Sequence, residues 1–178
     1  ITSDVIRGSG LSRDQLVGAN VERSESLDLG MVRFKLYSVE ADEVVNIIAL
    51  ARIQPSQLQF DPKFYQYGGA FLYPLGGWYL ALSKLGLVHV APLEKMLAQP
   101  QQMDRVWIAG RAFVLIAFVI SSFLLFFTLL EIASAPFALA GLAIYLFCPA
   151  SIMFSQVIKP HWYALLWVNA ALLIVVRA

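Results

Sequence analysis

Three long runs without a charged side chain lie near the end of the sequence, and they restrict the folds that this chain can adopt. The runs cover residues 112–130, 132–158 and 162–176. A membrane-spanning helix needs about 20 predominantly apolar residues, and a single small water-soluble domain has no core large enough for three such segments. The sequence therefore predicts an integral membrane protein, or a part of one.

The charged residues are concentrated in the first part of the chain. Residues 1–63 contain seven of the 13 Lys and Arg residues and nine of the 12 Asp and Glu residues. Only 14% of all residues are charged, compared with roughly 25% in an ordinary soluble domain. We therefore expect an extramembrane segment over 1–63 and membrane helices over 64–178. The net charge of +1 gives no reason to expect a nucleic-acid partner.

The uncharged segments predict an all-α polytopic membrane protein with three to four membrane helices. The first segment, residues 64–83, carries aromatic residues, four glycines and a proline, and it is expected to dip into the membrane or cross it. Pro136 favours a helix start near its own position, and Pro149 favours a kink near the end of that helix. The expected membrane helices cover about 64–88, 107–130, 134–155 and 161–177.

A short amphipathic helix is expected near residues 40–53, beside the membrane. Ser38 is suited to cap it, and Asp42 and Glu43 fall in its first turn, where the helix dipole favours carboxylates. Pro55 is expected to end it. Its apolar positions at helical spacing are Val44, Ile47, Ile48 and Ala51. Such a stripe suits a helix that lies along the membrane surface.

Local patterns elsewhere in the chain are weaker. Before the amphipathic helix, the sequence favours a short helix over residues 11–16 and an extended segment over 31–37. The chain contains no phosphate-binding glycine loop and no GxSxG, CxxC or HExxH motif, so the common soluble catalytic sites are excluded. The only cysteine, Cys148, has no second cysteine with which to form an internal disulfide.

Two places in the sequence carry ionisable residues beside the apolar runs. Asp42 and Glu43 are either simple first-turn carboxylates or a catalytic base and metal ligand held at the bilayer surface. Lys159 and His161 flank a proline, and they belong either to an ordinary loop or to a functional site at the membrane boundary. A lone histidine is not a metal site, so Asp42 or Glu43 would supply the second ligand. Asn169 is interpreted as a contact between helices.

Several segments follow one another in an order typical of one family. They are residues 34–38, the acids Asp42 and Glu43, residues 60–69 and 73–74, Arg111, residues 148–155 and residues 159–161. In this order they resemble the N-terminal part of the GT-C class of integral membrane glycosyltransferases. Within that class they are similar to the protein O-mannosyltransferase and aminoarabinose-transferase-like enzymes, the phospholipid-carrier-dependent glycosyltransferase family 39. The resemblance covers residues 34–178 and implies that the chain is the N-terminal fragment of a larger protein.

The resemblance implies inverting transfer of a sugar from a polyprenyl-phosphate carrier to a hydroxyl or amine of a glycan, lipid or protein. Asp42 is then expected to act as the base with Glu43 in support, while Lys159, His161 and Tyr67 bind the substrate. A divalent metal, Mg²⁺ or Mn²⁺, is expected at Asp42 and His161. Many relatives carry an acid at the position of His161, so the role of this residue departs from the family pattern.

The resemblance also implies a location and leaves one alternative. The protein is expected in the lipid bilayer of a bacterial inner membrane, with the site on the extracytoplasmic side. The alternative is a membrane transporter or a non-catalytic subunit of a membrane complex, since the interrupted segment 64–83 suits a transporter site. A transporter is expected to place its ionisable groups inside the helix bundle, whereas Asp42 and Glu43 precede a surface helix. Their position favours the enzyme.

Overall fold

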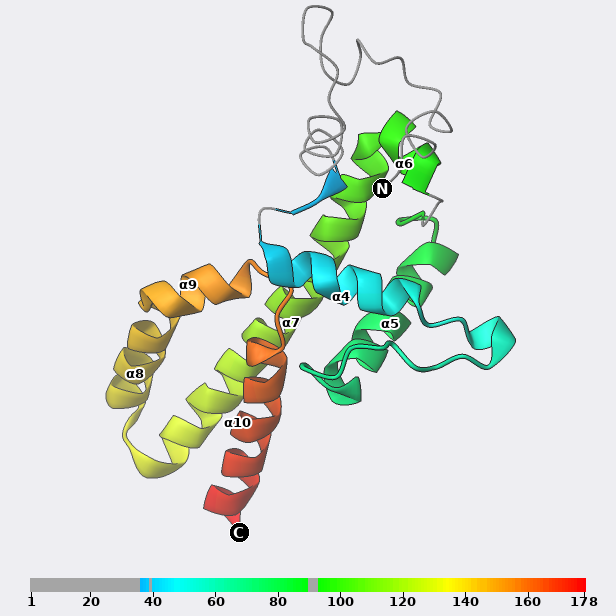
Figure 1. Ribbon diagram of the computed structural model, residues 1–178. Helices are drawn as coiled ribbons and strands as arrows, with labels where there is room; N and C mark the ends of the chain where they lie inside the picture. The colour runs from blue at the N-terminus through cyan, green and yellow to red at the C-terminus, as the bar shows by residue number, and fades with distance from the viewer. Residues whose placement is uncertain (1–35, 39, 90–92) are drawn as a thin grey trace, which may run out of the picture.

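Every element in the computed structural model of the protein is helical (Figure 1). The structure describes residues 36–38, 40–89 and 93–178. These residues contain no strand, and their one β-type pairing is an isolated bridge between Gln54 and Gln59. The all-α expectation is therefore confirmed for this part of the chain. The expected helix over 11–16 and residues 31–35 of the expected extended segment lie outside the described residues.

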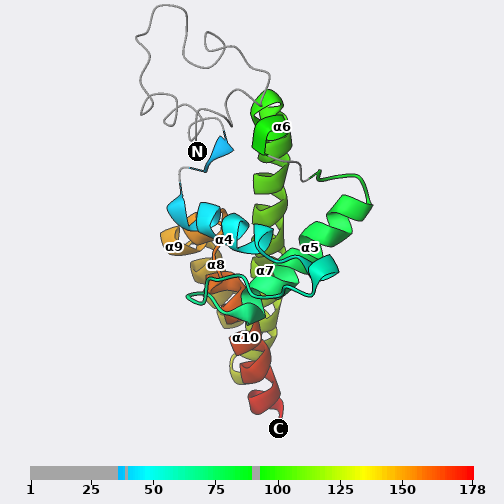
Figure 2. The same ribbon diagram turned by 45° about the vertical axis from the view of Figure 1, so that its right-hand side comes forward.

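The helices form a small bundle with one helix laid across it. They are α4 (Ala41–Ala51), α5 (Gly69–Lys84), α6 (Leu93–Ala98), α7 (Pro100–Ile132), α8 (Ala135–Phe147), α9 (Pro149–Ser155) and α10 (His161–Arg177), with a 3₁₀ turn η1 (Pro55–Gln57) after α4. In both ribbon views α7 and α10 lie side by side and run in the same direction, and α8 returns along α7 (Figures 1 and 2). The helix α4 crosses this bundle close to the start of α10 (Figure 1).

Two of the membrane-type helices begin at other residues than expected, and the local sequence explains why. The helix α5 begins at Gly69 rather than at residue 64, because Gly68 precedes it with a φ of 68° that ordinary residues rarely adopt. The helix α7 begins at Pro100 rather than at residue 107, because proline suits the first position of a helix.

The expected helix over 134–155 is divided into α8 and α9. The two pieces meet at an angle of 58°. Between them Cys148 has extended backbone, with φ −61° and ψ 128°, because a residue that precedes a proline is kept out of helical geometry. Pro149 then becomes the first residue of α9. The expected kink at Pro149 is therefore a full break, after which α9 runs across the bundle at nearly the level of α4 (Figure 1).

The helix α4 begins and ends differently from the sequence expectation. The hydroxyl of Ser38 accepts the backbone N–H of Glu40, the residue just before the helix, at 3.2 Å, and in the described chain no side chain caps the first turn. The helix ends at Ala51, and the N–H of Arg52 bonds to the carbonyl of Ala49 at 3.2 Å. It therefore stops before Pro55, which opens the following 3₁₀ turn.

The buried face of α4 is not the apolar stripe predicted from the sequence. The residues that point into the protein are Glu43, Asn46 and Ala49, whereas Ile48 is 43% exposed and Ala51 is also exposed. Both sets follow helical spacing, but at roughly 100° per residue the centres of their faces differ by about 150°. A buried acid and a buried amide on one helix face require partners, and these partners define the candidate site.

Close packing brings the start of α10 against α7. A Cβ atom on Gly110 would lie 2.4 Å from Ile158 Cδ1 and 2.4 Å from the hydroxyl oxygen of Tyr79. Glycine is therefore needed here for the loop before α10 to reach α7. The hydroxyl of Tyr79 donates to the carbonyl of Val106 at 2.8 Å, so α5 is held against α7 at the same level.

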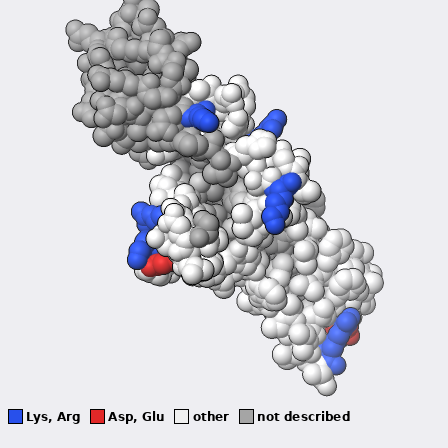
Figure 3. Space-filling view, turned by 90° about the vertical axis from the view of Figure 1, so that its right-hand side faces the viewer, with Lys and Arg blue, Asp and Glu red and all other residues white. Residues whose placement is uncertain are grey.

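One described helix, α7, is long and apolar enough to cross a membrane, and α8 with α9 meets the same test only as a bent pair. The 17-residue α10 is apolar but shorter. By this test the described residues contain one candidate span, or two if the bent pair is a span, so the expected three to four spans are not confirmed. Only 28% of the most apolar window of α7 is buried. Figure 3 shows a correspondingly large uncharged surface along the lower part of the molecule.

Candidate functional site

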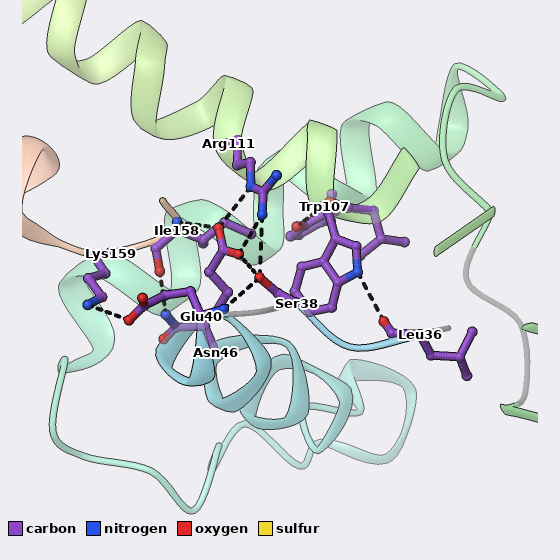
Figure 4. Close-up of polar contacts among 11 residues, drawn as sticks. Leu36, Ser38, Glu40, Asn46, Trp107, Arg111, Ile158 and Lys159 are labelled. Atoms are coloured by element: carbon purple, nitrogen blue, oxygen red, sulfur yellow. Dashed lines mark hydrogen bonds and ion pairs between the residues drawn. The ribbon is translucent and has the colours of Figure 1, made fainter. Parts of the chain in front are cut away.

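The candidate site lies where α4 crosses α7 and meets the loop that leads into α10 (Figure 4). Residues from three distant segments come together there, with Glu40 and Asn46 on α4 or at its start, Arg111 on α7, and Ile158 and Lys159 in the loop. The local geometry follows from α4, because its first turns carry four polar residues within seven positions. Helical spacing directs these residues to two neighbouring faces.

Glu43 is completely buried and accepts hydrogen bonds from three other residues. Arg111 donates from Nε to Oε1 at 3.0 Å and from Nη2 to Oε2 at 2.8 Å. The backbone N–H of Ile158 donates to Oε1 at 2.9 Å, and the hydroxyl of Ser38 donates to Oε2. Burial alone would raise the pKa of Glu43, but these hydrogen bonds outweigh it and hold the pKa below its ordinary value. Glu43 is thus an ionised structural anchor.

Asn46 binds the same loop from the next turn of α4. Its Nδ2 donates to the carbonyl of Ile158 at 2.8 Å. Glu43 therefore holds the N–H of Ile158 and Asn46 holds its carbonyl, so α4 fixes both backbone groups of one residue. The Oδ1 atom of Asn46 is buried and has no partner among the described residues. The orientation of the loop before α10 is consequently set by α4.

Lys159 lies one residue farther along and binds two carboxylates. Its Nζ is 2.7 Å from Glu40 Oε1 and 2.9 Å from Asp42 Oδ2. The Lys159 side chain is only 15% exposed, while those of Glu40 and Asp42 are 43% and 42% exposed. The hydrogen bond from Lys159, followed by that from Tyr67, lowers the pKa of Asp42. Glu40 and then Asp42 raise the pKa of Lys159, so the Asp42–Lys159 pair is charged at neutral pH.

Tyr67 and His161 complete the set of residues proposed from the sequence. Tyr67 lies beside Asp42 and contributes to the lowering of its pKa, and the Tyr67 ring packs edge-on against Phe64 with centroids 5.4 Å apart. His161 is the first residue of α10, and its ring meets that of Phe154 edge-on at 5.2 Å. The charge of His161 also acts to lower the pKa of Asp42. The structure thus brings Asp42, Lys159 and Tyr67 together with His161 beside them.

The expected metal at Asp42 and His161 has no preformed ligand set in the described residues. No group of three or more His, Cys, Asp or Glu side chains lies close enough to hold an ion in this part of the chain. The carboxylate of Asp42 is instead paired with Lys159. Because the donor set does not fit a divalent metal, we derive no step through one.

The sequence interpretation missed Glu40 and Asn46 as members of the site, and it left Arg111 without a partner. A polar residue between the apolar positions of α4 was the available signal for Asn46. Arg111 was noted as the charge that opens an apolar run, but its pairing with Glu43 joins residues 68 positions apart. No local pattern reports such a contact.

A second polar contact joins α7 and α10 inside the bundle. Asn169 donates from Nδ2 to the hydroxyl of Ser121 at 2.9 Å and to the carbonyl of the same residue at 3.3 Å. The hydroxyl of Tyr145 on α8 lies 3.4 Å from that of Ser121. Asn169 is 5% exposed, so it links helices, as the sequence suggested.

Comparison with protein-family models, with curated proteins and with solved structures finds no match to the chain.

Proposed function

We propose that this chain forms part of a membrane-embedded glycosyltransferase, which transfers a sugar from a polyprenyl-phosphate carrier to a hydroxyl or amine with inversion. The observation that supports this proposal most is the half-exposed carboxylate of Asp42, held 2.9 Å from the ammonium of Lys159 by a rigid surface helix. A carboxylate beside a cation provides the two groups that such a transfer requires. The resemblance to the GT-C class points in the same direction.

The arrangement of charges supports a membrane position for the bundle. Arg111 and Glu131 are 20 positions apart on α7, which corresponds to about 30 Å of helix, the thickness of the hydrocarbon core. Glu131 pairs with Arg177 at the far end of the bundle, where Oε1 and Nε are 2.7 Å apart. The bilayer would then surround α7, α8 and α10 between these two levels, and α4 would lie at one surface with Ile48 towards the lipid.

This placement brings the site to the level where a lipid carrier presents its headgroup. In the proposed topology α7, the bent pair of α8 and α9, and α10 cross the bilayer, and α5 enters it in part. The surface with α4 is the extracytoplasmic side of a bacterial inner membrane. Asp42 and Lys159 face that surface, since neither lies on the part of the bundle that the bilayer covers.

The proposed reaction uses one bond formation and one bond cleavage. The acceptor oxygen or nitrogen attacks the anomeric carbon of the sugar from the face opposite the phosphate, and its proton passes to the carboxylate of Asp42. The bond between the anomeric carbon and the phosphate oxygen breaks, and the electron pair leaves with polyprenyl phosphate. Lys159 stabilises the added negative charge on that phosphate. Asp42 afterwards releases the proton to water.

The ion pair of Asp42 with Lys159 gives the resting state of such a site. While the pair is closed, the pKa of Asp42 is lowered, which makes the carboxylate a weaker base. Binding of the donor phosphate draws Lys159 towards the substrate and raises the basicity of Asp42 at the same moment. Tyr67 remains beside Asp42, and His161 at the start of α10 provides a further contact for the phosphate.

The decisive experiment compares sugar transfer by the full-length protein and its Asp42→Asn variant in nanodiscs, with a panel of polyprenyl-phosphate sugars. We expect the variant to lose about a hundredfold or more of the activity, in accord with loss of a general base. The control is Glu131→Gln, which removes a carboxylate at the far end of α7 and is expected to leave the activity unchanged. Equal activity in the wild type and Asp42→Asn would remove Asp42 as the base.

Lack of transfer with every donor would favour the alternative of a transporter or a non-catalytic subunit. The two are then separated by measuring lipid-phosphate uptake in proteoliposomes. Uptake that depends on Asp42 would indicate transport, and no uptake would indicate a subunit. Either result would replace the proposal.

A further inference from the structure

We infer that the ammonium of Lys159 is a built-in cation, which occupies the place between Glu40 and Asp42 that a divalent metal would otherwise fill. The inference rests on the proposed function, because it assigns the cation of the same site. Its consequence is a metal-independent site with Glu40 as a positioning residue. This replaces the expectation of Mg²⁺ or Mn²⁺ bound by Asp42 and His161.

The geometry of the cluster is that of a bridged cation. One ammonium lies 2.7 Å from a carboxylate oxygen of Glu40 and 2.9 Å from one of Asp42. A hard divalent cation would bridge the same two oxygens at about 2.0–2.6 Å. With the ammonium present the three groups carry a net charge of −1, and without it they would carry −2. Removal of the ammonium therefore leaves two facing carboxylates, which are the ligands that such cations prefer.

The backbone next to Lys159 is anchored to α4, which limits where its ammonium can lie. The residue before it, Ile158, is bound through its N–H to Glu43 at 2.9 Å and through its carbonyl to Asn46 at 2.8 Å. The Nζ of Lys159 also lies 5.9 Å from the ring centroid of Phe154, within the range of a cation–π contact. Only 15% of the side chain is exposed. These contacts hold a single positive charge in one place, as a bound ion would be.

A shared lysine can perform the function of a metal without leaving the site. An ammonium has three donor hydrogens, so it can turn one from Asp42 towards the leaving phosphate while Glu40 retains another. Glu40 thereby sets the position from which Lys159 acts. The substrate class that this arrangement suits is a lipid-linked phosphate ester, whose leaving oxygen gains charge as the sugar departs.

The test measures Mn²⁺ binding to the full-length protein in metal-free nanodiscs by electron paramagnetic resonance, so it does not depend on turnover. We expect the wild type to bind no Mn²⁺ at this site at about 1 mM, whereas Lys159→Ala and Lys159→Met expose the two carboxylates and gain a weak site in that range. The Mn²⁺ bound by these variants should exceed the non-specific background of the wild type by about tenfold, and it should return to that background when Asp42→Asn is added. Lys159→Arg retains the positive charge and should resemble the wild type.

The chain provides a matched control in Lys63. Its Nζ is 2.8 Å from Asp61 Oδ2, and among the described residues it pairs with this one exposed carboxylate. Lys63→Ala should therefore gain no Mn²⁺ site. Equal gains in Lys63→Ala and Lys159→Ala would overturn the inference, and so would Asp42-dependent Mn²⁺ binding by the wild type. Thermal unfolding of each variant identifies any that are misfolded, and the wild-type measurement tests the inference by itself.

A second measurement separates this inference from the proposed function. If the protein transfers sugar, the rate should be unchanged by a chelator that removes divalent ions. Loss of activity with chelator and its return with Mg²⁺ would overturn the inference and leave the glycosyltransferase proposal intact. Complete lack of transfer would count against the proposed function. The Mn²⁺ measurements would still test whether the ammonium of Lys159 occupies a potential metal site.

Discussion

Asp42 and Glu43 are neighbours on one helix, yet the protein places them in opposite environments. Glu43 is fully buried and accepts hydrogen bonds from Arg111, Ser38 and the backbone of Ile158. Asp42 is 42% exposed and meets Lys159 at the rim of the same cluster. Consecutive helical residues point about 100° apart, so one helix carries a structural acid and an accessible acid side by side.

The difference indicates how the two acids divide the work. A carboxylate surrounded by charged and backbone donors has no free lone pair directed at a substrate, and its proton affinity is low. A carboxylate that is paired with one lysine at the protein surface can exchange that partner for a substrate group. The buried acid thus keeps α4 in register with α7 and α10, and the accessible acid remains available for chemistry.

The largest effect on stability is expected from Glu43→Ala. The substitution leaves the Arg111 guanidinium and the Ile158 N–H without their acceptor, at a cost of about 3 kcal/mol, the lower end for a broken buried pair. The lower end applies because the Arg111 side chain is 44% exposed and can be solvated. Asp42→Ala should change the free energy of unfolding by less than about 1 kcal/mol. Thermal unfolding in one detergent compares the two, and equal losses would abolish the distinction.

The pH dependence of stability should separate the same two acids. The pKa of Glu43 is lower in the folded protein than its ordinary value of 4.5, so the unfolded chain binds more protons in the interval between the two. The stabilisation by Glu43 is therefore complete above pH 4.5 and is lost as the pH falls through the folded pKa. The midpoint of thermal unfolding should therefore fall at acidic pH in the wild type, and it should fall less in Glu43→Gln.

The matching control for this fall at acidic pH is Asp42→Asn. The pKa of Asp42 is also lowered from 3.8, but solvent screens its pair with Lys159, so this variant should leave most of the fall in place. Lys159 has the opposite pH dependence, because its pKa is raised above 10.5 in the folded protein. The stabilisation by Lys159 is present below pH 10.5 and is lost as the pH rises through the folded pKa. An undiminished fall at acidic pH in Glu43→Gln would contradict the assignment.

The sequence was sufficient to locate α4 and the loop at Lys159, because both are signalled by local composition. Acids at a helix start and a lone polar triplet between apolar runs are visible within a few residues. The sequence was insufficient to say which acid is buried, because this depends on Ile158, which lies 115 positions from Glu43. Hydrophobicity predicted an apolar stripe along α4 that suits a membrane surface, but it gave no sign that Glu43 and Asn46 on another face would be buried by hydrogen bonds to that distant loop.

The same reasoning accounts for the helix boundaries. The prolines correctly predicted the start of α8 and the interruption before α9, because a proline acts on the residues next to it. The extension of α7 back to Pro100 was missed because the expected helix over 107–130 followed the apolar segment, and the charged Asp104 and Arg105 lie before it. A helix can continue beyond an apolar segment when its charged residues are not buried, and Arg105 is exposed.

A smaller effect is expected inside the bundle, from Asn169→Leu. Asn169 is buried like Glu43, with 5% of its surface exposed. Unlike Glu43 it is neutral, and its amide nitrogen donates to one residue, Ser121. We expect a loss of about 1 kcal/mol, typical of a hydrogen bond between membrane helices. A double-mutant cycle with Ser121→Ala measures the coupling directly. A loss as large as that of Glu43→Ala would show that burial, rather than charge, sets the cost.

The smallest effect should come from the ion pair at the opposite end of the bundle. Arg177 Nε and Glu131 Oε1 are 2.7 Å apart, a distance as short as those in the site, but the side chains are 56% and 37% exposed. Arg177→Gln should change the free energy of unfolding by less than about 0.5 kcal/mol, because solvent competes for both groups. The same thermal unfolding assay checks this at low and at moderate salt. A destabilisation near that of Glu43→Ala would mean that separation alone, without burial or further donors, determines what an ion pair contributes in this protein.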